Sequence, residues 1–134
     1  MLYLKSVIVL ATIACSFVAA NIKEERKKKC TFKCSTLHEP LVGGCATIIG
    51  HDFQGLPNKW QIKHAYKTEG HKQLWNCLGT GMEISICCLS GKIVIPPKAN
   101  PRVMTIEGFD PGYGNICGDS SPLDKNSPGV KDCI

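Results

Sequence analysis

The sequence predicts a small disulfide-rich domain that is β-dominated (α+β), with a central β-hairpin and one short helix. Two observations predict this class: a high density of cysteines, and short apolar runs that alternate with polar residues and end at glycine or proline. Cysteine-dense chains of this size are typical of exported domains, and the few long apolar runs indicate a modest core. The length fits one domain.

Residues 1–20 resemble a signal peptide. Lys5 precedes an apolar run from Val7 to Val18, and two alanines end the segment. The run is shorter than the roughly 18 to 20 apolar residues that a membrane-spanning helix needs. We therefore expect export, cleavage near Asn21 and no transmembrane anchor. The alternative, an N-terminal core helix, would leave the charged and small-residue flanks unexplained.

Removal of the signal peptide also removes Cys15, which leaves eight cysteines. This even number is what complete pairing requires, and an oxidising compartment keeps such bridges intact. The sequence does not choose among the pairings. Cys87 and Cys88 are adjacent, and successive side chains of a strand point to opposite faces, so we expect them to bind different partners in two layers. Four structural bridges are predicted among Cys30, Cys34, Cys45, Cys77, Cys87, Cys88, Cys117 and Cys133.

A basic arm, residues 21–29, precedes the first of these cysteines. Without Lys5, fifteen basic side chains remain against eleven acidic ones, a net charge of +4, and five of the fifteen lie in this arm. Because like charges repel and bury little apolar surface, we expect the arm to be disordered. Its roles would be an electrostatic tether, a dibasic processing site or only a solvated leader. The candidate electrostatic contacts are Lys23, Arg26, Lys27, Lys28 and Lys29.

Residues 30–134 form the single predicted stapled domain. An apolar run at residues 46–49 predicts a strand, which Gly50 ends. Asn58 is a candidate cap for a helix over residues 59–69. The same stretch also alternates with a period of two, which is typical of a strand, at Trp60, Ile62, His64 and Tyr66.

The predicted hairpin lies further along the chain. Residues 82–87 alternate between apolar and other side chains, residues 89–92 form a turn, and residues 93–95 are a second apolar run. A further strand is predicted at residues 102–106. From Gly108 onward glycine, proline, serine and aspartate dominate, so we expect a tail that only its two cysteines hold to the body.

A zinc site would need Cys30, Cys34 and His38, whose spacing by fours places them on one face of a helix. Thiols of an exported protein meet oxidant first, and no second ligand pair completes a four-ligand site. The sequence therefore predicts no metal and no cofactor.

An enzyme would need an activated nucleophile or a positioned acid and base. The even cysteine count leaves no free thiol, and Gly-x-Ser-x-Gly is absent. A small secreted ribonuclease would pair histidines about a phosphate, and the chain offers residue types for it without a diagnostic spacing. These candidates are His38, His51, His64 and His71, with Glu69, Glu83 and Arg102.

Aromatic residues among lysines are the pattern of a single-stranded nucleic-acid surface, and Trp60, Tyr66 and Trp75 are interleaved with basic residues. A small domain with two tryptophans needs them for its core, so we interpret all three rings as core and infer no specific nucleic-acid signal.

Cysteine order carries one resemblance. Cys30-x-x-x-Cys34, Gly43-Gly44-Cys45, Ala65-Tyr66, Trp75-Asn76-Cys77 and Cys87-Cys88 follow one another between residues 30 and 89. This order resembles small secreted cysteine-rich proteins of filamentous fungi, particularly rust-type plant pathogens, many of which are regarded as candidate effectors. The resemblance implies an exported protein and brings no catalytic residues.

The function expected from these observations is that of a secreted, extracellular, effector-like interaction protein, not an enzyme. It would bind an extracellular protein or polysaccharide, either a host or a cell-wall component, and the strands after Gly79 would offer an edge for the partner. Two alternatives stay open. One is a cationic membrane-active toxin or antimicrobial protein that uses the basic arm, and the other is the ribonuclease.

Overall fold

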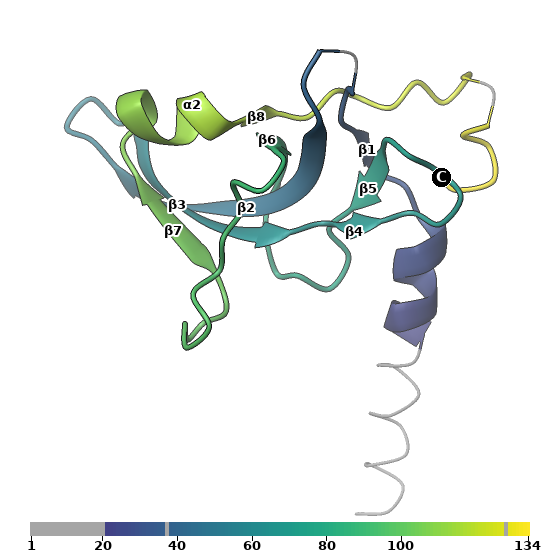
Figure 1. Ribbon diagram of the computed structural model, residues 1–134, viewed down its shortest axis with the longest axis horizontal. Helices are drawn as coiled ribbons and strands as arrows, with labels where there is room; N and C mark the ends of the chain where they lie inside the picture. The colour runs from purple at the N-terminus through teal and green to yellow at the C-terminus, as the bar shows by residue number, and fades with distance from the viewer. Residues whose placement is uncertain (1–20, 37, 128) are drawn as a thin grey trace, which may run out of the picture.

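The computed structural model describes residues 21–36, 38–127 and 129–134 (Figure 1). The expected signal peptide, residues 1–20, lies outside the described residues. The described part is dominated by two antiparallel sheets, with short helices and four disulfides, which confirms the predicted class of a small disulfide-rich α+β domain. Within these ranges, no helix has the length and apolar character needed to cross a membrane.

The larger sheet has the strand order β7-β3-β2-β6-β8. Ala46, at its centre, is fully buried and pairs with Ile62 on one side and Ile84 on the other. The predicted strands at 46–49 and 102–106 are confirmed, the first within a longer strand and the second shifted toward the C-terminus. The strands are β2 (Leu41–His51), β3 (Pro57–His64), β6 (Ile84–Leu89), β7 (Met104–Glu107) and β8 (Cys117–Asp119).

The smaller sheet has the order β1-β5-β4. It consists of β1 (Phe32–Lys33), β4 (Tyr66–Lys67) and β5 (Leu74–Asn76). Only Ala65 separates β3 from β4, so the chain passes directly from one sheet into the other. Figure 1 shows the smaller sheet at one end of the long axis and the β2–β3 loop at the other end.

A short segment after β7 covers one face of the larger sheet. It comprises η1 (Phe109–Tyr113), in which Asp110, Pro111 and Gly112 have non-helical dihedral angles, and the single turn α2 (Gly114–Ile116). The Tyr113 ring stacks on the buried Trp60 ring of β3, with centroids 4.5 Å apart and an interplanar angle of 10°. Burial, with a smaller effect from Asp119, raises the pKa of Tyr113 to about 12. The stacked pair belongs to the same buried core cluster as Ala46, Ile62 and Ile86.

Four disulfides join the layers. Cys87 binds Cys34 beside the smaller sheet, whereas Cys88 binds Cys117 of β8, which confirms that the adjacent cysteines have different partners. The expectation that only two cysteines hold the tail to the body is wrong, because Tyr113 stacks on Trp60, β8 pairs with β6 and Val130 is buried beside Leu74. The bridges are Cys30–Cys133, Cys34–Cys87, Cys45–Cys77 and Cys88–Cys117.

The helix predicted over residues 59–69 is wrong. Residues 57–64 form β3 instead, with Trp60 and Ile62 buried while the residues between and beside them are partly exposed. The period-two pattern therefore determines the structure, because β3 lies between β2 and β7 and can bury this row against the core. The Asn58 cap signal is local and is overridden by tertiary pairing.

The predicted hairpin is half right. Its first strand is β6, and Gly91 occupies the turn with φ of 77°. Residues 93–95 do not form a strand. The edge of β6 that they would pair with is taken by β8, which the Cys88–Cys117 bridge holds there. Ile93 is nevertheless buried in the core, so the apolar run serves packing rather than pairing.

The expected disorder of the arm is also corrected. Residues 21–28 are helical, and Ile22 and Arg26 are partly buried. Because isolated helices of this length are marginal in water, the helix depends on its contacts with the body. Those contacts involve Asn76 and Thr68, two buried polar residues of the smaller sheet region.

Candidate interaction surface

The clearest candidate surface is the hairpin tip, which we define as residues 49–56, the last residues of β2 and the loop that leads to β3. Phe53 is 97% exposed, Leu56 57% and Ile49 43%. Single exposed apolar residues are common on protein surfaces, but three within eight residues at one protruding end form a local apolar cluster. Figure 1 shows this loop projecting from the end of the larger sheet. The tip can therefore insert apolar side chains into a partner.

Asp52 holds the loop of the tip in one shape. Its carboxylate Oδ1 accepts hydrogen bonds from the backbone N–H of Gln54 at 2.8 Å and of Leu56 at 2.9 Å. Its own backbone N–H donates to the Leu56 carbonyl, and its carbonyl accepts from Gly55 N–H. Gly55 has φ of 80°, a conformation that other residues rarely adopt. Phe53 is thus displayed on a loop that is already ordered.

A second exposed aromatic residue lies at the same end of the sheet. Phe109, 61% exposed, follows Gly108, whose backbone N–H donates to the Asn58 carbonyl of β3 at 2.8 Å. The nearby Lys59 and Glu107 form an ion pair of 2.7 Å, which lowers the pKa of Glu107 through the hydrogen bond and the charge of Lys59. This end therefore displays two exposed aromatic rings beside a Lys59–Glu107 ion pair.

The predicted electrostatic contacts of the arm do not act as one group. Arg26 is occupied: its Nε donates to the Leu78 carbonyl at 2.9 Å, and its guanidinium lies 4.2 Å from the Tyr66 ring centroid. The other four candidates, Lys23, Lys27, Lys28 and Lys29, are exposed. The arm and the hairpin tip lie at opposite ends of the long axis (Figure 1).

Backbone carbonyls at the end of the arm helix are satisfied by the body. Asn76 Nδ2 donates to the carbonyls of Arg26 and Lys29, both at 2.8 Å, and the Glu69 N–H donates to Lys27. Thr68 Oγ1 donates to the Lys29 carbonyl at 2.5 Å. Nothing in the sequence marks Asn76 and Thr68 for this role, because the groups they meet are about 40 to 50 residues away.

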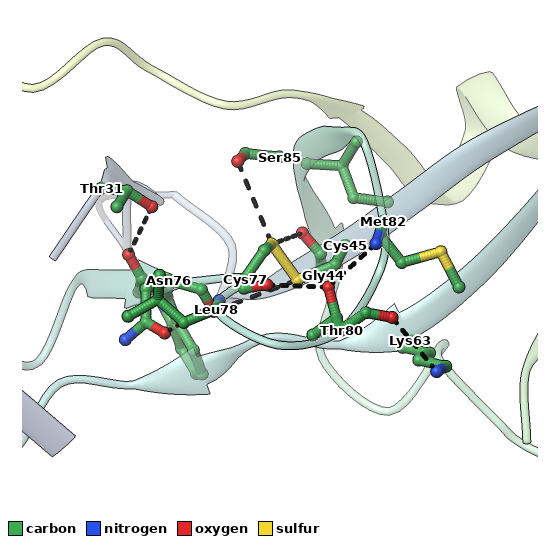
Figure 2. Close-up of a disulfide and its surroundings, with 12 residues drawn as sticks. Thr31, Gly44, Cys45, Lys63, Asn76, Cys77, Leu78, Thr80, Met82 and Ser85 are labelled. Carbon is green, nitrogen blue, oxygen red and sulfur yellow. Dashed lines mark hydrogen bonds between the residues drawn. A yellow bond between two sulfur atoms is a disulfide. The ribbon is translucent and has the colours of Figure 1, made fainter. Parts of the chain in front are cut away.

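Figure 2 shows the Cys45–Cys77 bridge, which anchors the chain directly after Asn76. Thr80 Oγ1 donates to the Cys77 carbonyl at 2.8 Å, and Lys63 Nζ donates to the Thr80 carbonyl at 3.3 Å. The bridge therefore fixes Asn76 and the following loop against β2 and β3. Asn76 is in position to hold the arm because of this covalent anchor.

The three predicted core aromatics have different environments. Trp60 is buried, which confirms that prediction. Trp75 is partly buried against Gly43, and Tyr66 is 36% exposed beneath Arg26. The core interpretation is thus wrong for Tyr66, whose ring serves to dock the arm.

The histidine candidates are not assembled into one acid-base pair on the β2–β3 ribbon. His64 pairs with Gly44 at one end of β2, and His51 ends the strand, seven residues away or roughly 23 Å at strand rise. His71 Nε2 lies 3.7 Å from the Asp132 carboxylate. His71, Asp132 and Cys133 come together in a metal-like group, but Cys133 is bonded to Cys30 and offers no thiolate.

The zinc set considered from the sequence lacks free thiols. Cys30 and Cys34 belong to different disulfides, so neither offers a thiolate ligand.

Comparison of the chain with protein-family models, with curated proteins and with solved structures finds no match.

Proposed function

We propose that the chain is an exported protein that acts outside its cell of origin by binding an extracellular protein. In the effector-like interpretation, this partner is a protein of a host. The observation that supports this most directly is the ordered, apolar hairpin tip with Phe53 almost fully exposed. Four disulfides are consistent with an oxidising extracellular compartment.

The tip has the physical properties of an interface anchor. Transfer of an exposed Phe or Leu side chain into an apolar pocket contributes about 1.5–3 kcal/mol, so Phe53 and Leu56 together would contribute about 3–6 kcal/mol. That is roughly 100-fold to 20,000-fold in affinity. The Asp52 hydrogen bonds order the loop before binding, which lowers the entropic cost of association.

The structure favours this proposal over a membrane-active protein. Insertion into an anionic bilayer is strongest when cations flank the apolar residues that enter it. Here the exposed lysines of the arm and the apolar tip lie at opposite ends of the molecule, and Arg26 is occupied by Tyr66 and Leu78. The ribonuclease alternative gains no support from His51 and His64, because His51 ends β2 whereas His64 ends β3 and pairs with Gly44, seven residues along β2 from His51.

The test compares partner capture from extracellular extract by wild type, two variants and reduced protein. F53S/L56S removes the anchor, V94S removes another exposed apolar side chain outside the tip, and reduced protein controls for adhesion to unfolded chain. We expect a partner that wild type and V94S retain and F53S/L56S loses. Equal capture by F53S/L56S, or no partner above the reduced control, would contradict the proposal.

A further inference from the structure

A groove lies at the end of the molecule opposite the hairpin tip. It has a volume of about 970 Å³ and is bounded by residues 33, 35 and 36, by the turn at 70–74 and by residues 121–124, 127, 129 and 130 of the C-terminal tail. This volume is at the upper end of the range for small-ligand sites. The groove is separate from the hairpin tip, so the inference below does not depend on the proposed function.

The groove is framed by covalent and backbone contacts. Lys33 and Ser121 exchange backbone hydrogen bonds of 3.4 and 3.2 Å, and Cys34 N–H donates to the Gln73 carbonyl at 3.0 Å. The Cys30–Cys133 bridge holds the far end of the tail. The walls of the groove therefore belong to the disulfide-linked body of the protein.

The floor of the groove is apolar, and its rim is polar. Leu74 and Val130 are buried in one cluster against which Leu123 packs. The rim carries the hydroxyls of Thr36, Ser121 and Ser127. No Phe, Tyr or Trp side chain is among the described residues that line the groove, where the imidazole of His71 is the single ring, so an extended platform for stacking successive nucleic-acid bases is not present there.

The rim carries more positive than negative charge. Lys33 and Lys72 are exposed, and neither side chain belongs to an ion pair among the described residues. The exposed carboxylate of Asp124 also lies on the rim, where it accepts the Asn126 backbone N–H at 2.9 Å and keeps its negative charge. An anionic ligand would therefore meet two ammonium groups against one carboxylate.

We propose that this groove binds an acidic oligosaccharide. The apolar floor suits the C–H faces of sugar rings, the Ser and Thr hydroxyls suit sugar hydroxyls, and Lys33 and Lys72 suit the carboxylate or sulfate groups. Uronate and sulfated saccharides share this chemistry. An acidic peptide would use the lysines but would have less use for the hydroxyl rim.

The experiment is calorimetric titration of the full exported chain with saccharides of equal length: a tetra-uronate, a sulfated tetrasaccharide and a neutral tetrasaccharide. We expect binding of one or both acidic saccharides that weakens with salt, and no binding of the neutral one. The acidic saccharide that binds identifies the anionic group. Failure of both to bind overturns the proposal, and so does equal binding of the neutral saccharide.

Matched double variants locate the site. K33Q/K72Q should weaken binding roughly tenfold, since each exposed charge contact contributes a few-fold in affinity. K92Q/K98Q removes the same charge from two exposed lysines outside the groove and should change affinity less than about twofold. Equal weakening by both variants would indicate general charge attraction, and tight binding of an acidic peptide that K33Q/K72Q abolishes equally would refute a saccharide site.

Discussion

Replacement of Asn76 by alanine tests how the basic arm is held. Asn76 is fully buried, and its amide Nδ2 donates to the carbonyls of Arg26 and Lys29 while its Oδ1 accepts the Leu78 N–H at 3.3 Å. Each such bond contributes about 1 kcal/mol net. N76A should therefore lower the free energy that docks the arm by about 2 kcal/mol and the free energy of unfolding of the body by about 1 kcal/mol.

The loss should appear first as local opening of the arm. Once released, the arm carbonyls can be hydrated, so the cost is limited to the free energy that docks the arm. A loss of about 2 kcal/mol raises the open population roughly 30-fold. Hydrogen–deuterium exchange of the peptide covering residues 22–29 should accelerate by this factor, and trypsin should cleave at Lys27 and Lys28 sooner.

The matched control is N115A, which changes an exposed asparagine of α2 and should leave arm exchange unaltered. Arm exchange within about threefold of wild type in N76A would refute the reasoning, because two buried hydrogen bonds would then contribute almost nothing. Equal acceleration in N76A and N115A would refute it as well, since the effect would not be specific to the arm contact.

Three further outcomes are expected. G43A should lower the free energy of unfolding by about 2 kcal/mol, because the added Cβ would lie 2.5 Å from the Trp75 ring. G118A is the control and should be neutral, since open space surrounds Gly118. Equal unfolding midpoints of the two variants would contradict this prediction. Reduction should add eight hydrogens to the intact mass and unfold the chain, since each bridge contributes about 2–4 kcal/mol; free thiols before reduction would contradict it. The folded state keeps the Tyr113 proton up to about pH 12 and the unfolded state loses it near 10, so stability should fall by about 2–3 kcal/mol as pH rises between these values; an equal fall in Y113F would argue against it.

Local patterns predicted those strands that bury one face. The alternating row of β6 and the apolar run inside β2 are visible in the sequence because the period of a strand is two. For residues 57–64 two local signals disagreed, the Asn58 cap and the row through Trp60 and Ile62. Pairing with β2 and β7 decided the outcome, since a central strand gains hydrogen bonds on both edges.

The candidate surfaces were less visible than the strands. Exposure of Phe53 depends on where β2 ends and on the Asp52 hydrogen bonds that shape the loop. The basic arm was evident from its composition, but its helical state was not, because the partners of its carbonyls are Asn76 and Thr68, far along the chain. Charge density alone favoured disorder.

The sequence by itself determined the even set of eight cysteines after the signal-like segment, the divergence of Cys87 and Cys88 and the β-dominated class, because these follow from counting and from strand periodicity. Only the tertiary structure decided the four pairings, the exposure of the hairpin tip, the docking of the arm and the groove between residues 33–36 and the tail. Each of these depends on contacts between residues distant in sequence, and such contacts leave no periodic or compositional mark.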